Sequence, residues 1–342
     1  MLGPGMELGI TTFAETHPID GVPTSPADRL RRVIEEAELA EQVGLDVYAV
    51  GEHHRPDFAA SAPAVVLAAI AARTSRIRLS SAVTVLSTDD PVRVFEQFAT
   101  VDALSNGRAE IIAGRGSFTE SFPLFGYDLE DYDDLFAEKL GLLLALRDNE
   151  SVRWSGRFRP SLDGEPVHPR PVQQPLPVWL GVGGNPQSVV RAALLGLPMI
   201  LAIIGGTPER FVPFAELYRQ AQDQSALPRQ PLAVNAHGYV ADSMEQAKSE
   251  FYGPYARAMT TIGRERGWPP MTTQAFDQMA GPAGAMVIGA PEDAAEKILR
   301  MRELLGIERF LLHLSVGTMP HRQVLHAIEL FGTKVAALVR ES

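Results

Sequence analysis

The chain alternates short apolar segments with amphipathic segments along most of its length. Eight of the apolar segments have the length and composition of buried strands: Met6–Thr12, Asp46–Val50, Ile77–Leu86, Ala109–Ala113, Val178–Val182, Met199–Ile203, Pro231–Val240 and Arg309–Leu314. Apolar residues at helical spacing follow each of them. Strands that are apolar on both faces and are separated by helices form parallel sheets covered by those helices. Eight such units predict a closed (β/α)8 TIM barrel, with a doubly wound open sheet as the alternative.

Local signals mark where several of the helices begin. Ser25-Pro26, Asp90-Pro91 and Asn185-Pro186 each place a polar N-cap residue before a proline at the first helical position. Two segments, near residues 151–177 and 265–290, interrupt the alternation and are predicted to be irregular insertions. We therefore expect residues 1–342 to form a single barrel domain that carries two insertions.

The composition excludes several classes of function. Cysteine is absent, which rules out disulfides, thiolate nucleophiles and thiolate metal sites. The formal net charge of −11 disfavours binding to a nucleic-acid backbone. No apolar segment approaches the roughly 20 residues that a membrane span needs. We expect a cytoplasmic protein with no nucleic-acid partner and no membrane partner.

Glu52-His53-His54 follows the second predicted strand, at the end of the barrel where active sites lie. Metal binding fails the spacing test, because no helical His-x-x-x-His motif and no nearby third ligand are present. An imidazole at the barrel mouth can exchange protons near neutral pH. The sequence leaves open whether His53 is catalytic or the pair is structural.

Two further loops have the composition of an anion site. Arg115 lies between glycines where the fourth strand ends, and a guanidinium there can reach an anion or pair with a neighbouring helix. Gly183, Gly184, Asn185 and Ser188 surround the start of the helix after strand five, whose backbone amides suit a phosphate. The alternative is a plain glycine-rich turn. A Walker lysine is missing and the dinucleotide glycine pattern is incomplete, so together these loops favour a single phosphomonoester.

Six motifs then occur in a familiar order: Glu52-His53-His54, Pro91-Val92-Arg93, Leu104-Ser105-Asn106-Gly107-Arg108, Gly114-Arg115-Gly116, Phe125-Gly126 and Gly196–Leu201. With them the chain resembles the bacterial luciferase-like flavin-dependent monooxygenases, from about Met6 to the C-terminus. The resemblance implies a (β/α)8 barrel with an insertion and a homodimer formed through helices near the second and third strands. It also implies a small organic substrate, O2, and reduced FMN supplied by a separate flavin reductase.

The resemblance also assigns roles to individual residues. Arg115 matches the arginine that binds the FMN phosphate, and Gly184, Asn185 and Ser188, next to Gly183, match the loop and helix start that complete the phosphate site. Ala82 and Val83 match a non-prolyl cis peptide behind the isoalloxazine ring. His53 matches the histidine near the reactive face of the flavin, whereas His54 is expected to point away and hold the loop.

Two positions depart from luciferase itself. Gly114 stands where luciferase has a reactive cysteine, and Gly184 replaces an acidic residue. Both departures argue against light emission and leave FMN binding intact, since backbone amides suffice for the phosphate.

Two other functions stay open at this point: a deazaflavin-dependent oxidoreductase and a flavin-binding protein without turnover. The substrate is equally open, and aldehydes, ketones, alkanes and amines are all candidates. Four aromatic residues in loops are expected to line an apolar substrate pocket: Phe13, Phe118, Phe122 and Trp268.

Overall fold

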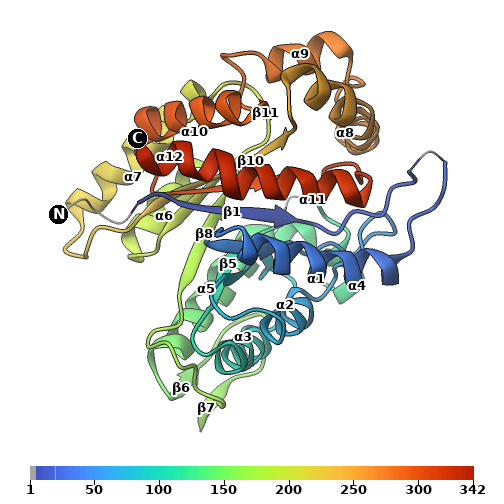
Figure 1. The fold of residues 1–342 in the computed structure, drawn as a ribbon. Helices are drawn as coiled ribbons and strands as arrows, with labels where there is room; N and C mark the ends of the chain where they lie inside the picture. Colours follow the sequence, from blue (N-terminus) through green and yellow to red (C-terminus); the bar gives the residue numbers. More distant parts are fainter. Residues whose placement is uncertain (1–4, 20, 117) are drawn as a thin grey trace.

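A closed parallel barrel forms the centre of the computed structural model, which describes residues 5–19, 21–116 and 118–342 (Figure 1). Going round the barrel, the strands are β1 (Glu7–Thr12), β2 (Val47–Val50), β3 (Arg78–Ser81), β5 (Ala109–Gly114), β8 (Val178–Val182), β9 (Met199–Ile203), β10 (Leu232–Val240) and β12 (Arg309–His313). Parallel pairing of β12 with β1 closes the sheet. The prediction of a (β/α)8 barrel is confirmed, and the open-sheet alternative is wrong.

Helices surround the barrel in the predicted alternation: α1 (Pro26–Gln42), α2 (Pro63–Ala71), α3 (Pro91–Ser105), α5 (Tyr132–Asp148), α6 (Pro186–Leu194), α7 (Val212–Gln224), α8 (Met244–Arg266), α10 (Pro291–Leu305) and α11 (His321–Leu330). The predicted N-caps are in place, because the side chains of Ser25, Asp90 and Asn185 each accept a backbone N–H from the first turn of their helix. A π-helical turn, Phe331–Val335, joins α11 to α12 (Ala336–Glu341).

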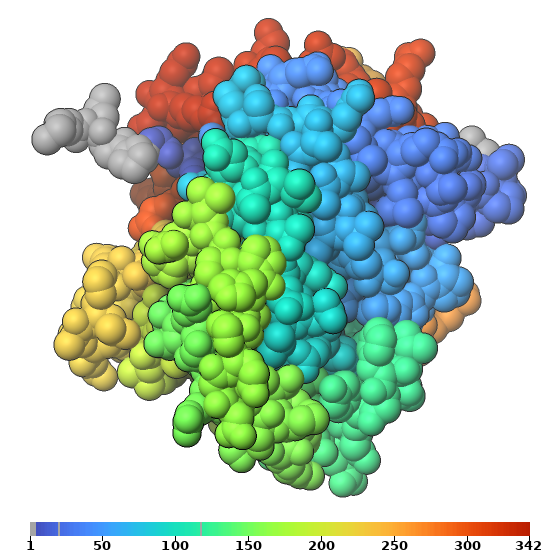
Figure 2. Space-filling view, turned by 90° about the horizontal axis from the view of Figure 1, so that it is seen from below, coloured from blue at the N-terminus to red at the C-terminus, as the bar shows by residue number. Residues whose placement is uncertain are grey.

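The two predicted insertions differ in how regular they are. The first contains the antiparallel hairpin of β6 (Ser151–Trp154) and β7 (Leu162–Pro166), which lies against α5. This hairpin (yellow-green) reaches the face shown in Figure 2. The second is less irregular than expected, since it holds α9 (Thr273–Ala280) and β11 (Val287–Gly289), which pairs with the end of β10. β11 is too short to show a sequence period, which is why the pattern missed it.

The third predicted strand, Ile77–Leu86, is in fact two strands. β3 ends at Ser81 and β4 (Thr84–Val85) pairs separately with β5. The peptide bond between Ala82 and Val83 is cis and interrupts the extended backbone between them. Between β5 and α5 lie a short helix, α4 (Ser121–Phe125), and the 3-10 turn Leu129–Asp131.

An ion pair closes the amino-terminal end of the barrel. The Arg309 guanidinium, whose side chain is 4% exposed, pairs with Glu110 and Glu7 and lies 4.2 Å from the centre of the Trp179 ring. Above this layer the interior is filled by small and branched side chains, including Ala49, Ala82, Ile112, Ile200, Ala233 and Leu311. A buried charge persists only when it is paired, and here the pairing seals one end. Space for a ligand is therefore left at the opposite end.

Candidate active site

A cavity of about 600 Å³ opens at the carboxyl-terminal ends of the barrel strands. Its walls come from the segments that follow β1, β2, β3, β5, β8, β9 and β12, from β10 itself, and from the last turns of α8. This is the end at which (β/α)8 barrels carry their active sites. The volume lies within the range of about 300–1,000 Å³ typical of ligand and cofactor pockets.

Arg115 lines the cavity directly after β5. Its guanidinium pairs with Asp133 in the first turn of α5 and lies 5.1 Å from the centre of the Tyr132 ring. The helix salt bridge that the sequence left open as an alternative is thus present. The Asp133 side chain is 66% exposed, so this partner can turn to solvent and leave the guanidinium to a bound anion.

The glycine-rich turn after β8 lies on the cavity wall. Gly183, Gly184 and Asn185 line the cavity, and a Cβ atom built on Gly183 would meet nothing within 4 Å. A ligand can therefore approach this backbone closely. Ser188, by contrast, is buried on α6 and is not among the lining residues, and its amide already donates to the Asn185 carbonyl at 3.1 Å.

The Ala82–Val83 peptide bond is cis, as predicted, and both residues line the cavity. Val83 packs on two glycines across the wall. A Cβ atom added to Gly114 would lie 2.5 Å from Val83 Cγ2, and one added to Gly181 would lie 2.9 Å from Val83 Cγ1. Glycine at position 114 is therefore dictated by the Val83 side chain, which leaves no room for a cysteine.

His53 is buried in the cavity wall and enclosed by aromatic rings. Its imidazole stacks on Phe58 at a centroid distance of 4.3 Å and meets Phe13 and Phe118 edgewise, each at 4.7 Å. Nδ1 lies 3.5 Å from a carboxylate oxygen of Glu120. Burial alone would raise the pKa of Glu120, but hydrogen bonds from His53 and from the backbone hold this pKa below its usual value. The Glu120 carboxylate therefore lies where it can compensate a positive charge on the His53 imidazole.

His54 fixes the loop after β2. Its Nε2 lies 2.8 Å from Glu52, and the other oxygen of Glu52 accepts the backbone N–H of Val85 in β4 at 2.9 Å. The hydrogen bond to Glu52 raises the pKa of His54. The expectation that His54 holds the loop agrees with these contacts. His54 is also among the residues that line the cavity.

Three buried polar side chains on the cavity wall were not predicted. Glu15 follows β1, His237 lies on β10 and His313 ends β12, and Glu15 Oε1 is 2.6 Å from His313 Nε2. The two residues are 298 positions apart, so no local motif could join them. The available signal was one histidine within the predicted strand Pro231–Val240 and another near the end of the predicted strand Arg309–Leu314.

The aromatic prediction is correct for three residues of four. Phe13, Phe118 and Trp268 line the cavity. Phe122 does not, because it is fully buried and stacks on Tyr132 at 5.5 Å. At the cavity mouth the Phe118 ring has Arg55 and Arg266 within 5.1 and 4.7 Å of its centre, and Arg55 pairs with Glu265 at the end of α8.

Within residues 5–19, 21–116 and 118–342, no three histidine or acidic side chains are grouped so that they could hold a metal ion. In the same part of the chain, no helix has the length and apolar character needed to cross a bilayer.

The sequence is similar to a family of known enzymes. Residues 6–309 match the luciferase-like monooxygenase family. N-acetyl-S-alkylcysteine monooxygenase from Bacillus subtilis is 26% identical over 321 residues, which cover 88% of this chain and 92% of that protein. An F420-dependent glucose-6-phosphate dehydrogenase from Amycolatopsis mediterranei is 30% identical over 162 residues, covering 45% of this chain and 48% of that protein.

Solved structures share the fold. A monooxygenase from Streptomyces bottropensis superposes with a TM-score of 0.85 at 22% identity, covering 97% of this chain and 99% of that one. The oxygenating constituent of 3,6-diketocamphane monooxygenase from Pseudomonas putida, in complex with FMN, has a TM-score of 0.79 at 17% identity, with coverages of 97% and 98%. Since the family match spans most of the sequence, the chain is an enzyme of the luciferase-like monooxygenase family.

Proposed function

We propose that the protein is an FMN-dependent monooxygenase that oxidises a small organic substrate with reduced FMN and O2. The observation that carries the proposal is the composition of one cavity. It combines a cation beside exposed glycine backbone, a wall containing the cis Ala82–Val83 peptide, and a buried imidazole enclosed by aromatic rings. These features suit a phosphate, an isoalloxazine ring and proton transfer, respectively.

Each group in the cavity then has a physical task. Arg115 releases Asp133 and binds the phosphate, together with the backbone of Gly183, Gly184 and Asn185 and with Ser188 supporting the helix start. Ala82 and Val83 support one face of the ring. When bound, reduced FMN would supply the two electrons needed to insert one oxygen atom of O2 into the substrate while the other atom leaves as water. His53 holds or moves a proton within its enclosure of aromatic rings.

The alternative cofactor is a deazaflavin, used for hydride transfer without oxygen. The resemblance to an F420-dependent dehydrogenase over 162 residues supports this alternative. FMN and a deazaflavin have different visible absorption spectra, so the spectrum of protein loaded from a mixture of the two identifies the cofactor. A flavin-binding protein without turnover would bind FMN and produce no oxygenated product from any substrate.

Two partners belong to the proposal: a separate flavin reductase and a second copy of the chain. Val65 on α2 and Leu104 on α3 are 67% and 64% exposed, and these two helices pack side by side. Exposed apolar residues on adjoining helices suit a homodimer interface of the kind expected for the second and third units of the barrel. Light scattering on a sizing column measures the oligomeric state, and a monomer would contradict this part of the proposal.

The decisive experiment supplies the enzyme with FMN, NADH and a generic flavin reductase, and screens aldehydes, ketones, alkanes and amines for oxygenated products. Oxygen consumption is recorded alongside product formation, with a reaction lacking the enzyme as the control for reduced flavin reacting in solution. A product that contains ¹⁸O from labelled O2 supports a monooxygenase. Oxygen consumption identical with and without the enzyme, together with no FMN binding, would reject the function.

A further inference from the structure

The His313–Glu15 pair lies on the cavity wall but has no part in the FMN site described above. Both side chains are nearly inaccessible, at 2% and 3% exposure, and His313 Nε2 is 2.6 Å from Glu15 Oε1. His313 also lines the cavity. Its second ring nitrogen, Nδ1, makes no hydrogen bond to any residue in the described part of the chain. One nitrogen is thus committed to Glu15 and the other is available to a ligand.

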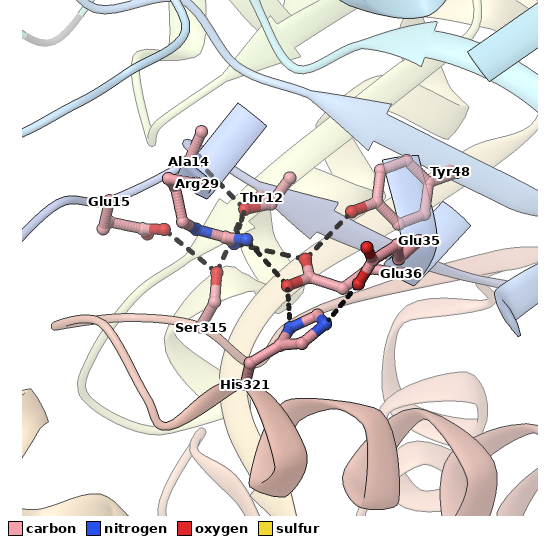
Figure 3. Close-up of polar contacts among 9 residues, drawn as sticks. All are labelled: Thr12, Ala14, Glu15, Arg29, Glu35, Glu36, Tyr48, Ser315 and His321. Carbon is pink, nitrogen blue, oxygen red and sulfur yellow. Dashed lines mark hydrogen bonds and ion pairs between the residues drawn. The ribbon is translucent and has the colours of Figure 1, made fainter. Parts of the chain in front are cut away.

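A directed chain of hydrogen bonds holds Glu15 as an acceptor (Figure 3). Thr12 Oγ1 accepts two N–H groups, from Arg29 at 3.1 Å and from the Ala14 backbone at 3.0 Å. Both of its lone pairs are then used, so its own hydrogen points to Ser315 Oγ, 3.1 Å away. The Ser315 hydrogen in turn goes to Glu15 Oε2 at 3.0 Å. Glu15 therefore accepts on one oxygen from Ser315 and on the other from His313.

This arrangement selects one tautomer of His313. Because Glu15 is an acceptor on both oxygens, the proton of the neutral imidazole lies on Nε2, and Nδ1 carries the lone pair. Arg29 fixes the position of Thr12 in this network, because its guanidinium is buried and pairs with Glu36 at 2.7 Å (Figure 3). In this tautomer Nδ1 is a hydrogen-bond acceptor on a residue that lines the cavity.

The histidine next to His313, His237, is held neutral by its surroundings. Burial would raise the pKa of Glu15, but the facing His313 and Arg29 hold that pKa at about 2. Burial, together with the nearby His313, lowers the pKa of His237 to about 3, so this ring stays neutral. Burial also raises the pKa of Tyr255, which lies 3.4 Å from His237, so the phenol stays neutral as well.

We propose that His313 is a second catalytic residue, which accepts a proton from a substrate consisting of a largely apolar body and a hydroxyl group. The apolar body follows from Phe13, whose ring meets both His313 at 4.5 Å and His53 at 4.7 Å. The hydroxyl donates to Nδ1; its O–H bond breaks, the proton moves to Nδ1, and the electron pair stays on the substrate oxygen. The resulting imidazolium is balanced by the Glu15 carboxylate, and no electrons are exchanged. The inference deepens the proposed oxygenase function and rests on it only for the oxygenation that follows.

The experiment compares two probes that differ by one hydroxyl, 4-propylphenol and propylbenzene. Each is titrated into the FMN-loaded protein by calorimetry, and the histidine ring nitrogens are followed by ¹⁵N NMR. We expect the phenol to bind about fivefold more tightly, the size of one net hydrogen bond. It should also shift the Nδ1 signal of a single histidine that is protonated on Nε2.

His313→Gln should abolish both the preference for the phenol and the shifted signal. Glu15→Gln should leave His313 as a mixture of tautomers and reduce the preference. It serves as the second test if His313→Gln does not fold. The matched control is His326→Gln, because His326 also pairs with a carboxylate, Asp242 at 3.1 Å, but is 40% exposed and away from the cavity. This control should behave as the wild type.

Equal binding of the two probes, no binding of either, or a preference that survives in His313→Gln would overturn the inference. Failure of the proposed function is observed separately, as absent FMN binding and unchanged oxygen consumption. The two probes can still be titrated into the protein without FMN in that case, so the two failures are distinguishable.

Discussion

Arg115 and Asp133 form an ion pair at the edge of the cavity, joining the end of β5 to the first turn of α5. The guanidinium is mostly buried, with 20% of its side chain exposed, while the carboxylate is largely in water. The arginine is therefore held by the fold, and the aspartate is the partner that can move. Because of this asymmetry, substitutions at Arg115 and Asp133 should have opposite effects on FMN affinity if the FMN phosphate binds to Arg115.

Replacing the arginine should weaken FMN binding. Arg115→Ala removes a charge-assisted, forked donor, and we expect a loss of about 2–3 kcal/mol in FMN binding free energy. Fluorescence quenching during FMN titration measures the affinity, and riboflavin, which lacks the phosphate, is the control ligand. An Arg115→Ala variant that binds FMN as tightly as the wild type would place the phosphate elsewhere.

Replacing the aspartate should have the opposite effect. Asp133→Asn removes a negative charge that competes with the phosphate for Arg115. Because the carboxylate is exposed, the gain is limited to about 0.2–1 kcal/mol, or up to about fivefold in affinity. The gain should shrink at high salt, which screens exposed charges. Asp134→Asn is a suitable control on the next residue, and an equal gain there would show a general charge effect.

Alanine substitutions at His53 and His54 should distinguish a catalytic residue from one that only holds the loop. His53→Ala is expected to reduce turnover by about 10²–10⁴-fold, the usual size of a general acid–base contribution, with FMN affinity nearly unchanged. Product formation and FMN titration are measured on both single alanine variants. Equal losses of turnover in the two, or a His53→Ala loss explained by weaker FMN binding, would assign both residues to structure.

The His54–Glu52 pair should make stability depend on pH. Glu52 raises the pKa of His54 in the folded protein. The stabilisation is therefore fully present below the pKa of the unfolded chain and is lost as the pH rises through the raised pKa. We expect the difference in unfolding free energy between wild type and His54→Gln, from urea titrations, to be larger at pH 5.5 than at pH 9. A difference that does not change with pH would show that His54 contributes only by packing.

The sequence could predict the barrel because its strands and helices are encoded by local periodicity. It could not predict interactions between distant segments, such as the one between Glu15 and His313. It also could not predict that the Phe122 side chain is buried in the protein interior and does not line the cavity. The cis peptide bond at Ala82–Val83 was predicted from the family resemblance alone, because the local sequence is typical of one continuous strand. Asp133 was not identified as the partner of Arg115 because α4 and a 3-10 turn separate the two residues along the chain.

The wall between Val83 and Gly114 offers a test by compensating substitutions. Gly114→Ala adds a Cβ atom 2.5 Å from Val83 Cγ2, closer than atoms can approach. Gly114 is not among the glycines with positive φ, so the backbone accepts alanine and the cost is steric alone. We expect Gly114→Ala to lower the unfolding free energy by about 1–3 kcal/mol, the usual cost of overpacking, and to weaken FMN binding.

Val83→Ala removes the clashing methyl groups, so the double variant Gly114→Ala/Val83→Ala should recover most of both losses. The double-mutant cycle is measured by urea unfolding and FMN titration, and additive effects of the two substitutions would contradict the packing described for this wall.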